Sequence, residues 1–265
     1  MKVNSLEIPG NKAPLAGNTN TGLLKLIALL LMMTDHIGCI FFPSVMELRM
    51  IGRMALPLYA WCLIVGTEHT RDIRWYALRL LLLAVLSQPL YCMALGHELS
   101  YLNILFLLFL AVCAIGGIRL NRFGSRIWAP MAAYVVLGLV KVDYGWKGLT
   151  FILLLYAVRK NRSGIAAVFI AFGLFWGTGT SVLRSFCGIP LDFLNLAGME
   201  PIAALFRLQA MIWLSLPLVL IPMPGKVYLP RLTGYLLYPV HLILLILLRM
   251  GSGISFQTLT HYLHF

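Results

Sequence analysis

Charged residues are scarce in this chain of 265 residues, in which Asp, Glu, Lys and Arg together make up 11% and only nine residues are acidic. Hydrophobic residues make up 60%, and the mean hydropathy is +0.88. A soluble domain of this length needs far more polar surface. The composition therefore excludes a soluble protein and indicates a polytopic protein of the lipid bilayer.

The shortage of acidic residues leaves a formal net charge of +12. In a soluble protein this excess would point to nucleic acid, but the basic residues here form no stripe with interleaved aromatic residues. We therefore expect no nucleic-acid partner. In membrane proteins, Lys and Arg crowd the cytoplasmic loops, so the basic residues report orientation instead.

Several motifs are also missing. The five cysteines form no C-x-x-C pair, so neither a disulfide framework nor a zinc site is expected. No H-E-x-x-H or G-x-S-x-G pattern supports metal-assisted or serine-dependent hydrolysis, and we expect no metal ion. Cys39 follows His36 by three residues, and it is either a small buried hydrophobe or a thiol acyl carrier.

The chain shows neither an internal repeat nor a segment long enough for a separate soluble domain. Residues 1–22 lack the apolar core and cleavage site of a secretory signal, and we expect a flexible cytoplasmic segment. Residues 23–250 are expected to form a single transmembrane domain. Residues 251–265 have mixed polarity, which predicts an interfacial tail on the extracytoplasmic side.

Apolar runs separated by Gly, Pro and charged residues predict an all-α fold of about nine transmembrane helices, or ten, around a central funnel. The fifth and sixth runs are short for a full crossing, which needs about 20 residues. The connection from Ser181 to Pro201 is long and fits a surface helix, a lid or a re-entrant piece. The expected spans are 23–42, 48–66, 75–93, 102–118, 127–140, 146–158, 164–180, 203–222 and 233–250.

Basic residues set the orientation of these spans. The segment before the first span and the even-numbered loops carry twelve Lys and Arg residues, against five in the odd-numbered loops and the tail. Because positive charges stay on the cytoplasmic side, we expect a cytoplasmic N-terminus and an extracytoplasmic C-terminus.

Two adjacent polar residues, Asp35 and His36, interrupt the first span. A charge in mid-membrane costs about 2.5–3.5 kcal/mol on the insertion scale. One interpretation is structural, in which a neutral His and an Arg-paired Asp hold helices together. The other is functional, in which the carboxylate orients an imidazole that acts as a general base in a wet cavity. Adjacent helix residues point about 100° apart, so Asp35 can instead meet Arg53.

Other polar residues are expected in two sets, one at the depth of His36 and one nearer the cytoplasm, as a passage through the membrane requires. The first set is Arg53, Asn103, Asp143 and Tyr144, and the second is Arg79, Tyr238 and His241.

Simpler interpretations remain open for several of these residues. Arg53 can be a structural counter-ion of Asp35, and Arg79 can extend to the inner headgroups. His241 can be a hydrogen-bonded packing residue, and Asp143 a solvated loop residue.

Five stretches of the chain resemble proteins of the TraX family, which is named for the pilin N-acetylase of conjugative plasmids. No single stretch is specific, but together they occur in the family's order from about Leu23 to Leu247. More broadly, the chain is similar to membrane-embedded acyltransferases, including lysosomal heparan N-acetyltransferase and bacterial enzymes that acetylate surface sugars. The stretches are LKLIALLLMMTDHIG, IGRMALPLYAW, NILFLLF, DYGWKG and YLLYPVHLILL. Relatives often carry an aromatic residue before the proline of the second stretch, where this chain has Leu56.

This resemblance implies an N-acetyltransferase of the bacterial inner membrane. It would move an acetyl group from cytoplasmic acetyl-CoA to an extracytoplasmic amine or hydroxyl, which in the type protein is the N-terminal amine of pilin. His36 would be the catalytic base with Asp35 as its support. For such a donor, the basic inner face and Arg79 could hold the phosphates by charge-assisted hydrogen bonds. The remaining substrate-binding residues would be Arg53, Asn103, Asp143, Tyr144, Tyr238 and His241. Direct transfer and an acetyl-enzyme both fit.

Two further function classes fit the sequence. A proton-coupled transporter could use Asp35 and His36 as its relay, although many transporters are built from repeats that this chain lacks. The second class is a non-catalytic assembly factor for a pilus or another surface appendage. The sequence fixes neither the acceptor nor the oligomeric state.

Overall fold

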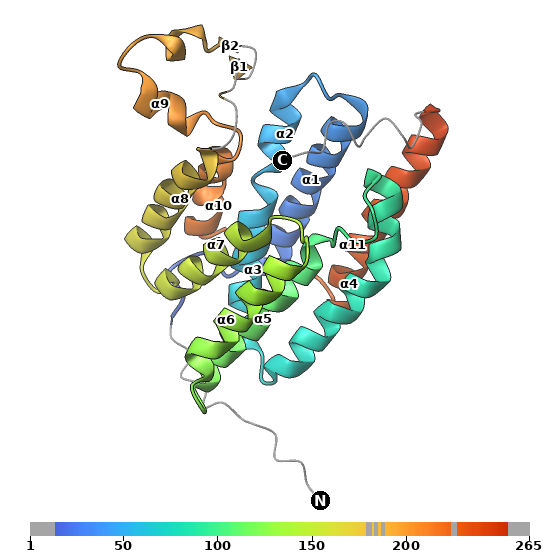
Figure 1. Ribbon diagram of the computed structural model, residues 1–265, viewed down its shortest axis with the longest axis vertical. Coiled ribbons are helices and arrows are strands. Elements are labelled where there is room, and N and C mark those ends of the chain that lie inside the picture. The colour runs from blue at the N-terminus through green and yellow to red at the C-terminus, as the bar shows by residue number, and fades with distance from the viewer. Residues whose placement is uncertain (1–13, 179–181, 183–184, 187–188, 224–226, 254–265) are drawn as a thin grey trace, which may run out of the picture.

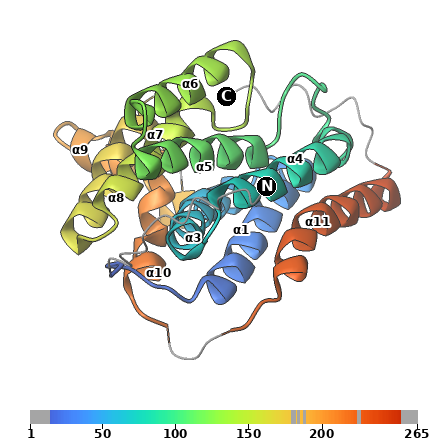
Figure 2. The same ribbon diagram turned by 90° about the horizontal axis from the view of Figure 1, so that it is seen from below.

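The computed structural model describes residues 14–178, 182, 185–186, 189–223 and 227–253. These residues form a mostly helical bundle in which α1, α3, α4, α5 and α11 pack together (Figures 1 and 2). The helices are α1 (Thr21–Phe41), α2 (Met46–Gly52), α3 (Ala55–His69), α4 (Ile73–Leu95), α5 (Ile104–Leu120), α6 (Ser125–Leu139), α7 (Gly145–Val158), α8 (Arg162–Gly177), α9 (Glu200–Leu205), α10 (Leu216–Leu220) and α11 (Arg231–Ser252), with 3₁₀ helices η1 (Asp192–Asn195) and η2 (Ala210–Ser215) and strands β1 (Ser185–Phe186) and β2 (Ile189–Pro190).

We call the end of the bundle where α1 meets α2 the upper end, and the end where α1, α4 and α11 begin the lower end (Figure 1). Of the expected flexible segment, residues 14–20 pack against the lower end, and residues 21 and 22 already belong to α1. There Asn18 is buried, and its carbonyl accepts a hydrogen bond of 2.7 Å from Trp61 Nε1. The expected interfacial tail, residues 251–265, lies almost entirely outside the described residues.

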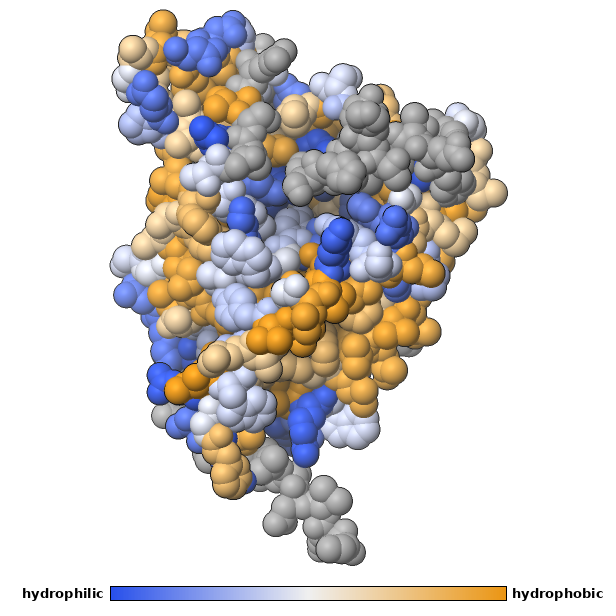
Figure 3. Space-filling view, in the orientation of Figure 1, coloured by the Kyte–Doolittle hydropathy of each residue, from blue (hydrophilic) through white to orange (hydrophobic). Residues whose placement is uncertain are grey.

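Within the described ranges, four helical stretches are long and apolar enough to cross a membrane, namely Thr21–Phe41, Met46–His69, Ile73–Leu95 and Thr233–Ser252. Their outer faces are apolar, with Leu30, Leu86 and Leu247 each at least 60% exposed. Figure 3 shows apolar surface along the two flanks of the face in view, with more hydrophilic residues between the flanks and at the two ends. These features fit a bilayer environment, in which leucine side chains face lipid.

The helices begin where small polar side chains can cap them. The side chain of Asn20 accepts the amide of Leu23 at the start of α1, and that of Asp72 accepts the amide of Arg74 at the start of α4. Asn103 and Asn161 do the same for α5 and α8. Each cap satisfies a backbone donor that has no partner within the helix.

One expected span is wrong. Residues 203–222 do not form a continuous helix but divide among the end of α9, η2 and the short α10. The run contains Arg207, Gln209 and Pro217, and the break at 206–209 precedes a 3₁₀ segment. Hydropathy averaged over the run hides these interruptions, because the flanking residues are strongly apolar.

The connection from Ser181 to Pro201 contains short elements over its described part rather than one surface helix. Strands β1 and β2 pair in an antiparallel ladder, and η1 follows. Leu191 and Leu194 are buried with Met50 of α2 in a second, smaller apolar cluster. This segment therefore forms a lobe at the upper end (Figure 1) and adds a small strand pair to the expected all-α fold.

The second expected span is bent at Arg53 and Met54, where α2 ends and α3 begins. Helix α2 approaches α1 closely through Gly52, which packs on the side chain of Asp35, and Gly38, which packs on Leu48. Glycine permits this spacing because it has no Cβ. The bend and the close approach together bring Arg53 against Asp35.

We expect Gly52→Ala to destabilise the protein, because the new Cβ would overlap the Asp35 side chain. Overpacking of this kind costs about 1–3 kcal/mol, which thermal unfolding of the purified protein in detergent would measure. Gly138→Ala is the matched control, since no atom lies within 4 Å of its Cβ position. Equal melting temperatures for the two variants would contradict this packing.

Candidate active site

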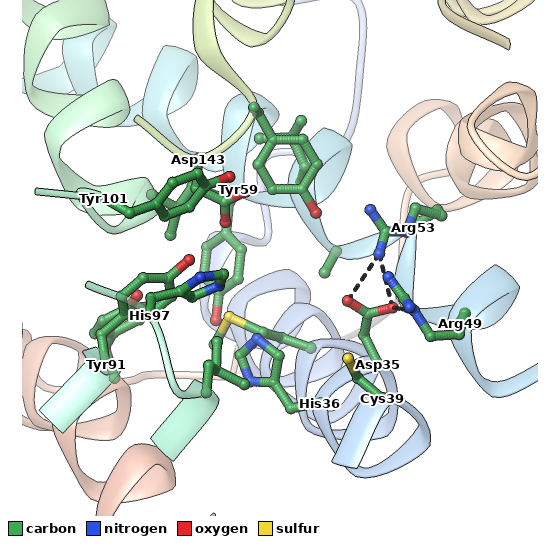
Figure 4. A pocket seen from close by; sticks show the side chains of 18 residues that line it. Asp35, His36, Cys39, Arg49, Arg53, Tyr59, Tyr91, His97, Tyr101 and Asp143 are labelled. Carbon is green, nitrogen blue, oxygen red and sulfur yellow. Dashed lines mark hydrogen bonds and ion pairs between the residues drawn. The ribbon is translucent and has the colours of Figure 1, made fainter. Parts of the chain in front are cut away.

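A cavity of about 70 Å³ lies near the upper end, between α1, the α2–α3 bend, α4, α11 and the loops 96–103 and 140–144. Figure 4 shows His36 at its base, the Asp35–Arg53–Arg49 group on one side, and Tyr91, His97 and Tyr101 on the other. We call it the upper cavity. Its polar and aromatic lining residues are Asp35, His36, Arg49, Arg53, Tyr59, Tyr91, His97, Tyr101, Asp143, Tyr144 and Tyr238.

Asp35 is held by two arginines. Arg53 Nη2 donates to both carboxylate oxygens at 3.1 Å, and Arg49 Nε lies 3.4 Å from Asp35 Oδ1. The three side chains are largely buried, with exposures of 6% for Arg53, 11% for Arg49 and 14% for Asp35. Of the two roles that the sequence left open for Asp35, the geometry favours the arginine-paired one.

His36 faces the cavity without such a partner. Among the described residues, its Nδ1 makes no hydrogen bond, and the ring stacks on His241 with centroids 5.6 Å apart and planes 17° apart. His241 itself is buried and does not line the cavity. The stack fixes the orientation of the His36 ring, and no hydrogen bond within the described residues occupies its buried Nδ1.

Three aromatic rings form the wall opposite the arginines. His97 and Tyr101 stack with centroids 4.5 Å apart, and His97 and Tyr91 with centroids 5.2 Å apart. Burial lowers the pKa of His97, which lies in the loop after α4. None of these three residues was predicted from the sequence to belong to the site. Their spacing follows no helical period, because a loop brings two of them back over α4.

Asp143 and Tyr144 reach the cavity from the loop between α6 and α7. Tyr144 has a φ of +63°, which is rare for a residue with a side chain. Its ring lies 6.0 Å from the Arg53 guanidinium and packs edge-on against Trp176. Burial raises the pKa of Asp143 from 3.8 to about 6, although the charge of Arg53 opposes the shift. Strained backbone beside a cavity is typical of functional sites.

Asn103 lies outside the lining of the upper cavity. Its side chain is fully buried, accepts the amide of Leu105 and donates to Gln88 Oε1 at 2.8 Å and to the Ala84 carbonyl at 2.9 Å. Gln88 in turn donates to the Tyr101 carbonyl at 2.8 Å. Asn103 therefore secures α5 to α4 and supports the loop that carries the aromatic wall.

Two further cavities continue from the upper cavity towards the lower end. The middle cavity, of about 150 Å³, shares Tyr59 and Tyr238 with the upper one. The lower cavity, of about 690 Å³, shares Lys25, Tyr76 and Tyr235 with the middle one. Arg79 lines the lower cavity, where its Nε donates to Tyr235 Oη at 3.3 Å. The expected polar set nearer the cytoplasm is thus divided. Arg79 lines the lower cavity and Tyr238 the upper and middle ones, whereas His241 lines none of the three and stacks on His36.

No group of three His, Cys, Asp or Glu side chains lies close enough to hold a metal ion within the described part of the chain. Cys39 also lines the upper cavity, although the residue is 4% exposed.

Comparisons with known proteins agree with the resemblance seen in the sequence. The model of the family described as TraX protein matches residues 20–249. A protein of Dichelobacter nodosus named probable fimbrial assembly protein FimC, serogroup H1, is 29% identical over 57% of this chain and 68% of its own length. Uncharacterized protein RP591 of Rickettsia prowazekii is 25% identical over 54% of this chain and 57% of its own length. No solved structure matches.

We expect Asp35→Asn to destabilise the protein more than Arg53→Gln does. Loss of the carboxylate leaves two neighbouring buried guanidinium groups without it, whereas loss of Arg53 leaves Asp35 with Arg49. Breaking a buried pair costs about 3–5 kcal/mol, and the double variant should recover part of that loss. Thermal unfolding would measure the order, with exposed Glu98→Gln as control. The reverse order would contradict the geometry.

As the pH rises from 4 to 7, the wild-type protein should lose stability relative to Asp143→Asn. Because its pKa is about 6 in the folded protein and 3.8 ordinarily, folding favours the protonated acid. That advantage is complete below pH 4 and is lost as the pH rises through 6. Melting temperatures of both proteins across this range test the sign. A constant difference, or a wild type that gains stability over the variant, would contradict it.

Proposed function

Because this chain belongs to the TraX protein family, we propose that it is a membrane-embedded acetyltransferase with His36 as its general base. The donor is acetyl-CoA, and the acceptor is an extracytoplasmic amine or hydroxyl. By family resemblance, the acceptor is the N-terminal amine of a pilin. The observation that carries this proposal is the His36 ring, which faces a cavity inside a membrane-spanning bundle while its neighbour Asp35 is engaged by arginines.

The succession of cavities supports a donor that arrives from the lower end. Coenzyme A is a polyanion that cannot cross a bilayer, but its pantetheine arm is thin. The arm would pass from the lower through the middle cavity, between Tyr59 and Tyr238, and bring the thioester to His36. Lys25 and Tyr235 lie on the first part of this path.

The acceptor would approach from the upper end, where loops 96–103 and 140–144 border the upper cavity. The aromatic wall with Tyr101 offers it apolar surface. Asp143, which pairs with no cation in an ion pair among the described residues, offers a carboxylate that can accept a hydrogen bond from a neutral amine or a hydroxyl.

The chemistry that follows is acyl transfer. The acceptor nitrogen or oxygen attacks the thioester carbonyl carbon while His36 takes its proton, and the carbonyl oxygen becomes an oxyanion. Arg49 and Arg53 line the same cavity and would stabilise that charge. The carbon–sulfur bond then breaks, and the thiolate leaves with the proton that His36 returns. If the acetyl group rested first on His36, the ring would act as a nucleophile and another group would have to take the proton of the acceptor.

The proposed location is the inner membrane of a bacterium, with the lower end and the N-terminus on the cytoplasmic side. The arrangement of the lower cavity supports this orientation, because its basic residues Lys25, Arg71 and Arg79 would face the side on which positive charge concentrates.

A non-catalytic assembly role is the second candidate. It is favoured by the name of the D. nodosus relative, which is that of a fimbrial assembly protein. Under this alternative the ion group and the His36–His241 stack hold the bundle together, and no thioester is consumed.

The two candidates differ in what His36→Gln does. Purified wild-type protein in detergent or nanodiscs, given labelled acetyl-CoA and a peptide with a free N-terminal amine, should release free thiol and label the peptide. His36→Gln should lower that rate about 10²–10⁴-fold, since general base catalysis contributes that much, while the melting temperature changes little.

Cys39→Ala is the matched control, because it removes the other nucleophilic side chain of the cavity. It should keep its activity if the thiol is not an acyl carrier. Full activity in His36→Gln, or loss of activity in Cys39→Ala alone, would contradict the role given to His36. No thioester cleavage by the wild type would favour the assembly role.

A further inference from the structure

The lower cavity collects basic side chains from three separate parts of the chain. Lys25 comes from the first turns of α1, Arg71 from the turn between α3 and α4, and Arg79 from α4. Its one acidic lining residue is Asp72, which caps α4. Asp72 Oδ1 lies 3.5 Å from Nε of Arg74, an arginine that does not line this cavity. The cavity therefore presents a net positive charge to whatever enters it.

An exposed indole stands in the same cavity. Trp75 lies in the first turn of α4 and is 61% exposed, although it is a large apolar side chain. The first turn of a 23-residue helix adds the positive end of the helix dipole beside it. The Trp75 ring lines the same cavity as three cationic side chains. This combination matches a ligand that carries a base and several phosphates, since aromatic side chains stack on bases and Arg and Lys bind phosphate.

The size and connections of the cavity fit the same ligand. At about 690 Å³ it falls within the range of about 300–1,000 Å³ of small-molecule pockets, whereas the cavity beside His36 measures about 70 Å³. Tyr76 and Tyr235 lie on its inner side and also line the middle cavity. A bulky polyanion would stop here while a thin chain continued inward.

From these observations we propose that the lower cavity is the binding site for the phosphorylated adenosine part of the acyl donor. Lys25, Arg71 and Arg79 hold its phosphates, and Trp75 stacks on its adenine. The site thereby selects donors by a group that lies far from the reacting carbonyl. This inference rests on the proposed function, because it presumes that the donor is a coenzyme A thioester.

The same basic residues could instead contact lipid headgroups, as long side chains at helix ends do. The two roles predict different behaviour towards a truncated donor. Acetylpantetheine carries the same thioester and arm as acetyl-CoA but no adenosine and no adenosine phosphates. A nucleotide site distinguishes the two donors, and a headgroup contact does not.

The experiment compares KM for acetyl-CoA and for acetylpantetheine in nanodiscs of one fixed lipid composition. Arg79→Gln and Arg71→Gln, at two arginines that line the lower but not the middle cavity, should each raise KM for acetyl-CoA about tenfold or more, because hydrogen bonds to charged groups contribute that much. Both should leave kcat and the KM for acetylpantetheine near the wild-type values. Arg74→Gln is the matched control, since this exposed arginine of α4 lines another cavity, and it should change neither KM.

A second measurement does not depend on turnover. Adenosine 3′,5′-bisphosphate should quench the fluorescence of the wild-type protein, and the quenching should be lost in Trp75→Phe and weakened in Arg79→Gln. If Arg79→Gln changes both KM values equally or neither, or if the bisphosphate quenches Trp75→Phe as much as the wild type, the inference is overturned. If the wild type consumes neither donor, the proposed function fails, and the quenching alone decides whether the nucleotide site exists.

Discussion

Two guanidinium groups and one carboxylate meet between α1 and the α2–α3 bend, and the upper half of the molecule takes its shape around them. Arg53 reaches Asp35 because the chain bends directly after Gly52, and Gly52 lets α2 lie against the Asp35 side chain. Burying such charges is expensive unless they are paired. The ion group therefore fixes α1 against α2 and holds the cationic side of the cavity in place.

This arrangement separates the roles of two adjacent residues. Asp35 points to the arginines, so His36, about 100° further around the helix, turns towards the cavity and the ring of His241. Because the arginines engage the Asp35 carboxylate, this carboxylate is not needed by the imidazole for the base role that we propose for His36. The structural and functional interpretations of the pair are then compatible, one for each residue.

Tyrosines continue this organisation along the molecule. Tyr59 and Tyr238 stand between the upper and middle cavities, and Tyr76 and Tyr235 between the middle and lower ones. A polar passage through a membrane protein must not leak ions or protons. Bulky side chains with one polar atom suit that requirement, because they close a narrow path yet can hydrogen-bond to a polar chain that enters it.

Much of the fold follows from the sequence because hydropathy is strong and local. The expected spans 23–42 and 233–250 fall within two residues of α1 and α11 at each end. The Asp35–Arg53 contact follows from depth, since two costly groups in neighbouring helices must pair. The prediction of one helix over residues 203–222 is wrong, because average hydropathy does not register the break before η2.

The site was harder to predict where loops form it. The aromatic wall joins Tyr91 of α4 to His97 and Tyr101 of the following loop, and no periodic pattern reports that the loop folds back. Asn103 was grouped with the site by depth, yet its amide is committed to Gln88 and to the Ala84 carbonyl. Depth identifies which polar residues share a level, but not which of them face a cavity.

The central claim is that donor and acceptor reach His36 from opposite ends of the bundle. Sealed inverted inner-membrane vesicles that contain the protein would test it, with labelled acetyl-CoA added outside and a peptide with a free N-terminal amine trapped inside. The account predicts that the trapped peptide becomes labelled while coenzyme A stays outside, and that vesicles with His36→Gln leave it unlabelled. Labelling that occurs only when peptide and acetyl-CoA share one compartment would contradict the claim.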